Sequence, residues 1–301
     1  MTIARISCPT DFSDASAHAI DLAVAMARWY NARIAAIHVI DAGVSVPEKG
    51  ISSSHNEADL SAIRARMASS FSSAANAGVE VDLFVEAGPP AARILESAAA
   101  LPADLIVIGT HGTAGFHHLV LGSVTERVLR KAACPVLTVP PRAQSTAQLP
   151  FRRLLCAIDF SDSALHALQF AVSLAKESDA RLTLLHVLEW PWEEPPSPNL
   201  ADLPAEQGAA LAEYRRYRET MALTELEKTA GLTRLAHSPT VLLRNGKPYR
   251  QILDVARDEG SDLIVIGVQG RTPMDIMFFG STANQVVRRA SCPVLTIRLS
   301  P

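Results

Sequence analysis

Short apolar runs alternate with amphipathic segments along the first 140 residues. The clearest run is 105–108 (Leu-Ile-Val-Ile), because β-branched apolar residues bounded by a glycine are typical of a strand buried on both faces. Strands are predicted at 3–8, 33–40, 79–85, 105–108 and 135–139. Helices are predicted at about 13–28, 57–77, 90–100 and 123–132. Strands and helices that alternate in this way predict a parallel, doubly wound sheet with helices on both faces.

The same pattern begins again in the second half. Asp11-Phe-Ser-Asp returns at Asp159, and Cys134-Pro-Val-Leu-Thr returns at Cys292. The second half is longer between its second and third strands, and we place the extra residues in the proline-rich segment 190–199. The fold class is therefore α/β, with two tandem Rossmann-like, doubly wound domains, each a five-stranded parallel sheet with four helices. The predicted boundaries are 1–140 for domain 1, 141–150 for a linker and 151–301 for domain 2.

A glycine-rich loop follows the buried run 105–108. It begins at Gly109, continues through Gly112 and ends at Gly122, after which a helical pattern starts at Ser123. A strand, a glycine loop and a helix N-terminus together bind phosphate, because glycine lets backbone N–H groups approach the anion and the helix start presents unpaired donors. The same spacing, Gly-x2-Gly-x9-Gly-Ser, recurs at Gly267, Gly270, Gly280 and Ser281.

The place of these loops in the sheet predicts a shared site. Ligands of doubly wound sheets lie beyond the carboxyl ends of the strands, so we expect Asp11, Val39 and the Gly109 loop to converge there. Alternatives stay open at each position. The glycines contact a ligand or only make the turn, Asp11 contacts a ligand or only forms a turn, and Ser123 contacts phosphate or caps the helix in a capping box with Glu126.

Composition excludes several classes of function. Hydrophobic residues make up 48% of the chain and charged residues 20%, which is ordinary for a globular protein. The net charge is −3 and neither half is basic, which disfavours a nucleic-acid partner. No apolar run reaches the roughly 18 residues that a membrane span needs. The N-terminus enters a strand directly without a signal-peptide pattern, so we expect a cytoplasmic protein.

Metal binding and catalysis find little support in the sequence. The four cysteines fall at equivalent positions of the two halves and read as small buried residues without zinc spacing: Cys8, Cys134, Cys156 and Cys292. His117 and His118 share the glycine loop, but adjacent histidines on a loop are usually solvated. The stretch 109–123 contains no lysine, and no nucleophile-and-base set stands out. The loop therefore suits holding a nucleotide better than hydrolysing it, and we do not expect an enzyme.

Three segments carry a resemblance to a known family. They are Pro9-Thr10-Asp11-Phe12-Ser13, His38-Val39-Ile40-Asp41 and Gly122-Ser123-Val124-Thr125-Glu126. With the repeated glycine motif, they resemble the ATP-binding branch of the universal stress protein family in its tandem two-domain form. The resemblance implies a role in stress tolerance through ATP-dependent or protein-contact regulation. It also implies association through the last strand of each domain, within one chain as a pseudo-dimer or between chains as a homodimer, and an unknown protein partner.

The resemblance assigns roles to residues of the first half. Asp11 would contact the ribose, the backbone near Val39 would read the adenine edge with Ile108 nearby, and the glycine loop would hold ribose and phosphates. The implied cofactor is ATP, with or without Mg²⁺. The complete implied site is Pro9, Thr10, Asp11, Val39, Ile108, Gly109, Gly112, Gly122, Ser123, Val124 and Thr125.

The second half matches less closely. Ala157 replaces Pro9, and Ala283 replaces Thr125, although Arg271 is gained and could meet a phosphate. We therefore expect ATP mainly in the first half. The matching positions are Asp159, Val187, Ile266, Gly267, Gly270, Gly280, Ser281 and Thr282.

Two other functions remain open. One is a slow ATPase or self-phosphorylating enzyme, with Ser123 or Thr125 as the phosphate acceptor. The other is a nucleotide-free interaction protein that docks a partner through the second glycine loop, which carries Met274, Phe278 and other apolar residues, and through the insertion at 190–210.

Overall fold

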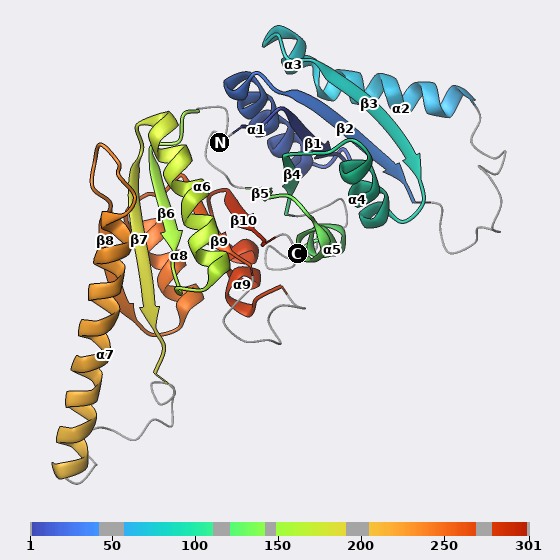
Figure 1. Cartoon of the computed structure of the whole chain (residues 1–301). Helices are drawn as coiled ribbons and strands as arrows, with labels where there is room; N and C mark the ends of the chain where they lie inside the picture. The colour runs from blue at the N-terminus through green and yellow to red at the C-terminus, as the bar shows by residue number, and fades with distance from the viewer. Residues whose placement is uncertain are drawn as a thin grey trace.

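The apolar runs of the first half form parallel strands. In the computed structural model β2 has the predicted bounds, and the other four strands begin and end within two residues of theirs. The structure describes residues 2–41, 57–110, 121–141, 149–190, 205–268 and 279–299 (Figure 1). The elements of the first half are β1 (Arg5–Pro9), α1 (Asp14–Tyr30), β2 (Arg33–Ile40), α2 (Glu57–Ser70), α3 (Ser72–Asn76), β3 (Val81–Ala87), α4 (Pro90–Ala100), β4 (Leu105–Gly109), α5 (Ser123–Lys131) and β5 (Val136–Val139).

The second half repeats this order, as the tandem duplication predicts. Its elements are β6 (Arg153–Ala157), α6 (Asp162–Ser178), β7 (Arg181–Leu188), α7 (Ala205–Gly231), β8 (Thr240–Asn245), α8 (Pro248–Asp258), β9 (Leu263–Gly267), α9 (Ser281–Arg289) and β10 (Val294–Ile297). Two predictions about these elements are wrong. The extra residues of the second half lie in and after α7 rather than in 190–199, because the offset between the halves is still 148 where α7 begins (205 against 57) and reaches 158 only where β8 ends (245 against 87). The other wrong prediction lies in the first half. The helix expected over 57–77 is divided at Phe71, whose carbonyl accepts from the N–H of Ala74 only three residues later, a tighter turn than the α-helix allows.

The two halves share one ten-stranded sheet rather than forming two separate sheets. The strand order is β3-β2-β1-β4-β5-β10-β9-β6-β7-β8, parallel within each half. At the centre β5 and β10 pair antiparallel, which is the contact between last strands that the family resemblance implied. The pairing is reciprocal, because Thr138 Oγ1 donates to Val294 O at 3.2 Å and Thr296 Oγ1 donates to Val136 O at 3.0 Å. An approximate two-fold axis therefore passes between these strands.

Helices bury both faces of the sheet. On one face α1, α2 and α6 enclose a core that includes Ile6, Leu22 and Leu154. On the other face α4, α5, α8 and α9 enclose a second core around Ile106 and Ile264. Strands covered on both sides explain why these runs are continuously apolar rather than alternating. Within the described residues, no helix is both long enough and apolar enough to span a membrane.

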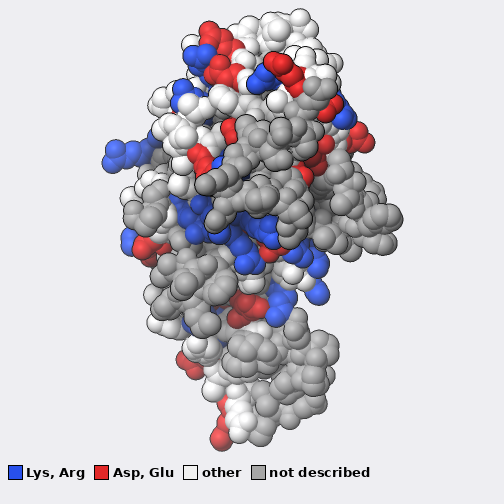
Figure 2. Space-filling model, turned by 90° about the vertical axis from the view of Figure 1, so that its right-hand side faces the viewer, with Lys and Arg blue, Asp and Glu red and all other residues white. Residues whose placement is uncertain are grey.

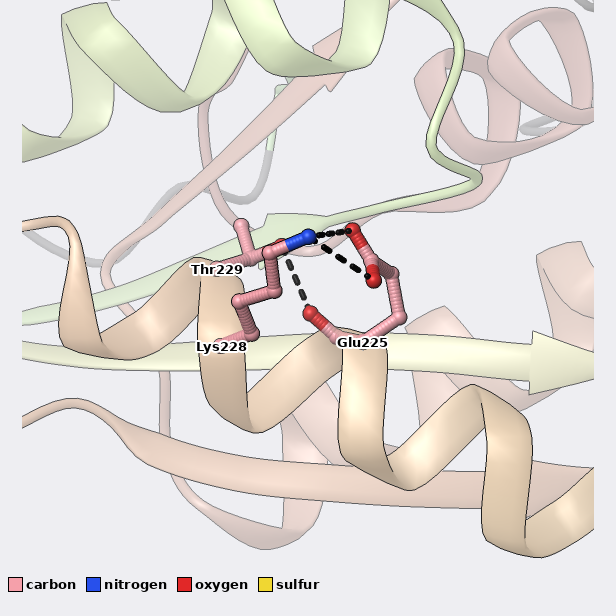
Figure 3. A network of polar contacts seen from close by, with 3 residues as sticks. All are labelled: Glu225, Lys228 and Thr229. Carbon is pink, nitrogen blue, oxygen red and sulfur yellow. Dashed lines mark hydrogen bonds and ion pairs between the residues drawn. The ribbon is translucent and has the colours of Figure 1, made fainter.

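Helix α7 is the largest departure from symmetry. Its N-terminal part extends beyond the end of β7 (Figure 1), and its C-terminal part packs against β7 and β8. Near the packed end, Lys228 Nζ lies 3.4 Å from Glu225 Oε2, and Thr229 Oγ1 donates to the Glu225 carbonyl at 2.7 Å (Figure 3). Such local contacts stabilise an exposed helix by only a few tenths of a kcal/mol each.

Basic side chains gather on one face of the molecule despite its net negative charge. Figure 2 shows them at the height where α5 and α9 lie in Figure 1. Both helices end in basic turns, with Arg130 and Lys131 on α5 and Arg288 and Arg289 on α9. Cations are favourable at helix C-termini because they complement the helix dipole. The helix ends thus explain the positions of these four basic side chains.

Candidate functional site

The turn between β1 and α1 is held by its own side chains. Asp11 Oδ1 accepts from the backbone N–H of Ser13 at 3.0 Å and from its hydroxyl at 2.6 Å, and Ser13 in turn caps α1 by accepting from Ser16 N–H at 3.2 Å. Thr10 Oγ1 accepts from the N–H of Phe12, which has a left-handed backbone (φ 63°). Asp11 is therefore a turn-forming residue. This role does not exclude a ligand contact, because the carboxylate is exposed.

The end of β4 lies against the start of α1. A Cβ atom on Gly109 would lie 2.8 Å from the carbonyl oxygen of Ala15, so only glycine fits this close approach. Beyond it, the N–H of Gly122 donates to Thr110 O at 2.9 Å and brings the two ends of the glycine loop together. Thr125 Oγ1 then donates to Gly109 O at 2.8 Å, which ties the first turn of α5 to the sheet. The loop interior, including Gly112, His117 and His118, lies outside the described residues.

The capping box predicted at the start of α5 is wrong. The N-cap residue is Gly122, which has no side chain, and Ser123 is the first helical residue. Glu126 is used elsewhere, since its carboxylate pairs with Arg130 at 2.9 Å and with Arg288 of the second half at 3.5 Å. The first turn of α5 therefore has no side-chain cap and presents its N–H groups at the carboxyl edge of the sheet.

A cavity of about 440 Å³ lies at this edge, and every predicted first-half residue that the structure describes lines it. The predicted residues in its wall are Pro9, Thr10, Asp11, Val39, Ile108, Gly109, Gly122, Ser123, Val124 and Thr125. The prediction missed five further lining residues, namely Ser16, Ile37, Asp41, Pro90 and Ile94. Asp41 follows Val39 closely in sequence and could have been found. Pro90 and Ile94 come from α4. The sequence indicated them only through the prediction that this helix starts at the same edge of the sheet.

The wall of this cavity has two kinds of surface. The apolar side chains of Ile37, Ile94 and Ile108 belong to β2, α4 and β4. The polar part combines the carboxylates of Asp11 and Asp41 with the start of α5. A cleft with an apolar wall, a few placed polar groups and a helix N-terminus suits a ligand that has both a flat apolar part and an anionic part.

The second half reproduces the framework of the turns. Asp159 Oδ1 accepts from Ser161 N–H at 2.9 Å and from its hydroxyl at 2.5 Å, and Phe160 has the same left-handed backbone as Phe12. A Cβ atom on Gly267 would lie 2.7 Å from Ser163, and Gly280 is the N-cap of α9, which begins at Ser281 and Thr282. Val187 and Ile266 occupy the ends of β7 and β9. Gly270 and Arg271 lie outside the described residues.

The chemistry of the second half differs at three points. Ile158 stands where Thr10 provides a hydroxyl, and Ala283 cannot make the bond that Thr125 makes to the sheet. Glu189, the counterpart of Asp41, forms an ion pair of 2.9 Å with Lys247. This half therefore keeps the turn aspartate at Asp159 but lacks the hydroxyls of Thr10 and Thr125.

The cysteines are not reactive groups. Burial raises the pKa of the Cys8 and Cys156 thiols far above their ordinary value. It raises the pKa of Cys134 to about 11 and that of Cys292 to about 12. Because the thiolate is the reactive form, a raised pKa makes these thiols less reactive. Cys8, Cys156 and Cys292 are buried as predicted, whereas Cys134 is half-buried.

The chain is similar to universal stress proteins over most of its length. A family model described as the universal stress protein family matches residues 2–140 and 150–298. The universal stress protein MJ0531 of Methanocaldococcus jannaschii is 38% identical over 143 residues, which cover 45% of this chain and 81% of that protein. The universal stress protein Rv2623 of Mycobacterium tuberculosis is 29% identical over 231 residues, which cover 72% of this chain and 71% of that protein.

A solved structure has the same fold. The crystal structure of a universal stress protein from Archaeoglobus fulgidus superposes with a TM-score of 0.66 and covers 98% of this chain and 96% of its own. The two sequences are 23% identical, so the likeness concerns the fold. It extends across both halves of the chain.

Proposed function

The chain belongs to the universal stress protein family, and from that premise we propose that its first half binds ATP. In this proposal the protein is a cytoplasmic regulator of the stress response that holds the nucleotide, and the second half holds it weakly or not at all. The observation that carries the proposal is the cavity at the carboxyl edge of the first half, where the described members of the predicted site lie together.

The cavity matches a nucleotide in volume and in the arrangement of its apolar and polar lining residues. Its volume of about 440 Å³ is within the range of small-molecule sites, roughly 300–1,000 Å³. The apolar side chains of Ile37, Ile94 and Ile108 suit a purine ring. Asp11, next to them, suits ribose hydroxyls, because a carboxylate accepts the hydrogen bonds that hydroxyls donate.

The start of α5 supplies the phosphate end. Gly122, Ser123, Val124 and Thr125 line the cavity, and the N–H groups of a first helical turn have no partner within the helix. The helix dipole adds about 0.3–1 kcal/mol for an anion at such a terminus. The bond from Thr125 to Gly109 keeps these donors fixed relative to the sheet, so little ordering is needed when the anion binds.

The same surfaces favour holding the nucleotide over hydrolysing it. Among the described lining residues there is no lysine, arginine or histidine to stabilise charge on a transferring phosphoryl group. Of the two candidate phosphate acceptors, Thr125 is buried, and its hydroxyl donates a hydrogen bond to the Gly109 carbonyl. Ser123 is exposed, so a self-phosphorylation reaction would use Ser123.

A nucleotide-free interaction module is the second candidate function, and α7 favours it. Its exposed side includes Tyr214, Tyr217 and Met221, with 46%, 59% and 52% of their surfaces accessible. Their spacing of three and four residues places them along one stripe of the helix. Exposed aromatic residues and methionine are enriched at protein interfaces, so this stripe suits a protein partner whether or not ATP is bound.

The test begins with the purified protein as it is isolated. We expect denaturation to release ATP, identified by chromatography and mass spectrometry, at about one per chain. Calorimetric titration of nucleotide-free protein would then compare Asp11→Ala with the matched variant Asp159→Ala. We expect the first to weaken ATP binding at least tenfold and the second to leave it unchanged. No released nucleotide together with no binding on titration would refute the proposal and favour the interaction module.

A further inference from the structure

We propose that His38 is a positioning residue of the nucleotide site, which occupies the carbonyl of Thr10, one residue past β1, and so leaves the backbone of Val39 available to the base. The inference rests on the ATP binding proposed above. It adds His38 to the site as a residue whose side chain acts on the nucleotide only indirectly, through the Thr10 carbonyl in the turn between β1 and α1. Its first test needs no nucleotide.

The backbone pairing between β1 and β2 shows where Val39 points. Thr10 N–H donates to Ile37 O at 2.9 Å, which continues the parallel ladder one residue past β1. In a parallel ladder the next bond would run from Val39 N–H to Thr10 O. On the other side of β2, Ile40 O accepts from Gly88 N–H at 3.0 Å, so Ile40 faces β3 while Ile37 and Val39 face β1.

A hydrogen bond from a side chain takes the place of the backbone bond expected at Thr10 O. His38 Nδ1 lies 2.8 Å from Thr10 O, and because a carbonyl can only accept, Nδ1 carries the hydrogen and donates it. Among the described residues, no backbone bond joins Val39 N–H to Thr10 O. Val39 lines the cavity. By the alternation of the ladder, its N–H and C=O are directed to the β1 side of β2, past the end of β1.

Packing holds the His38 ring in this position. The ring packs against Phe12 with 4.5 Å between centroids and 36° between the ring planes, and the guanidinium of Arg66 lies 4.1 Å from the centre of the Phe12 ring. Phe12 adopts a left-handed backbone, which is unusual for a bulky residue and persists only where the surroundings enforce it. The strain and the stack together indicate that the ring position is imposed rather than incidental.

The second half contains the same device and provides a matched control. His186 Nδ1 lies 2.6 Å from Ile158 O, and its ring stacks on Phe160 at 4.7 Å. Val187 follows His186 as Val39 follows His38. A change at His186 therefore disturbs an equivalent contact in the half that we do not expect to bind ATP strongly.

An exposed N–H beside an exposed C=O selects for adenine. The Watson–Crick edge of adenine presents an amino donor next to a ring acceptor, which complements one backbone acceptor and one backbone donor. Hypoxanthine, the base of inosine triphosphate, presents an acceptor next to a donor and reverses the match. Val39 would therefore discriminate ATP from inosine triphosphate, provided that its N–H is not already used.

The first experiment measures amide hydrogen exchange by NMR in nucleotide-free protein. In His38→Ala, Thr10 O is released and Val39 N–H can pair with it, so we expect the Val39 amide to exchange at least tenfold more slowly than in the wild type. His38→Asn places a donor near the position of Nδ1 and should keep the wild-type rate. Faster exchange of Val39 together with its neighbours in His38→Ala would mean a merely structural role and would overturn the proposal.

The second experiment titrates ATP and inosine triphosphate into the same variants. We expect the wild type to prefer ATP, His38→Ala to lose about tenfold of that preference, and His38→Asn and His186→Ala to retain it. An unchanged preference in His38→Ala would overturn the proposal. If the wild type binds neither nucleotide, ATP binding itself fails, and the exchange rate of Val39 alone decides whether His38 frees the backbone.

Discussion

The hydroxyl of Thr125 donates a hydrogen bond of 2.8 Å to the carbonyl oxygen of Gly109, which joins the first turn of α5 to the last residue of β4. Thr125 is only 4% exposed, so water cannot replace this bond. The counterpart in the second half is Ala283, which has no hydroxyl. The two halves thus differ at the point where a helix N-terminus is fixed against the sheet.

Thr125→Val should separate the hydrogen bond from the packing of the side chain. We expect the free energy of unfolding to fall by about 1–3 kcal/mol, because the Gly109 carbonyl loses its buried donor while the shape is kept. ATP affinity should fall as well. Urea unfolding and calorimetric titration measure the two effects. Thr125→Ser keeps the hydroxyl and should stay near the wild type. A Thr125→Val variant as stable as the wild type would contradict the role of this hydrogen bond.

Gly109→Ala tests the close approach of β4 to α1. The new Cβ would lie 2.8 Å from Ala15 O, a backbone atom that cannot move alone, so we expect a loss of about 1–3 kcal/mol in the free energy of unfolding. Gly231→Ala is the control, because no atom lies within 4 Å of its new Cβ at the end of α7. Thermal or urea unfolding should show that control unchanged or up to about 1 kcal/mol more stable. A stable Gly109→Ala variant would contradict the packing argument.

Glu126→Gln tests the ion pair that connects the two halves. Glu126 and Arg288 are 3.5 Å apart with 26% and 32% of their side chains exposed, so solvent screens them and we expect a loss below about 1 kcal/mol. The loss should shrink further at high salt. Glu96→Gln removes the partner of Arg93 within α4 and serves as a comparison inside one half. A loss of several kcal/mol for Glu126→Gln would show that the central contact depends on this pair.

Cys292 should make stability fall in alkaline solution. Burial raises the pKa of its thiol to about 12 from an ordinary 9.0. The unfolded chain therefore releases this proton at lower pH than the folded protein does. The contribution to stability is complete below about pH 9 and is lost as the pH rises toward 12.

Urea unfolding between about pH 8 and 10.5 measures how the free energy of unfolding changes with pH. In Cys292→Ala the free energy of unfolding should fall less steeply with pH, by up to about 1.4 kcal/mol per pH unit at the alkaline end, whatever the effect of the substitution at neutral pH. Parallel curves for the variant and the wild type would contradict the assignment of the proton to Cys292.

The elements and the location of the candidate site could be predicted from the sequence because both depend on local patterns. Strand β2 begins and ends at the predicted residues, since an apolar run between turn residues is specified by near neighbours. Asp11, Val39 and Gly109 meet at one cavity because consecutive parallel strands must place their carboxyl ends on the same edge. Whether that cavity holds ATP stays a prediction.

Tertiary structure decided what local patterns cannot express. Ser123 and Glu126 have the spacing of a capping box, but the chain enters α5 one residue earlier, and Glu126 pairs with Arg288, which is distant in sequence. Ile94 reaches the cavity from α4 only because that helix packs over the end of the sheet. His38 occupies the Thr10 carbonyl only because β2 lies beside β1. Sequence by itself determined the repeated framework, through periodicity and turn chemistry. Packing between distant segments determined which polar groups that framework leaves open to a ligand.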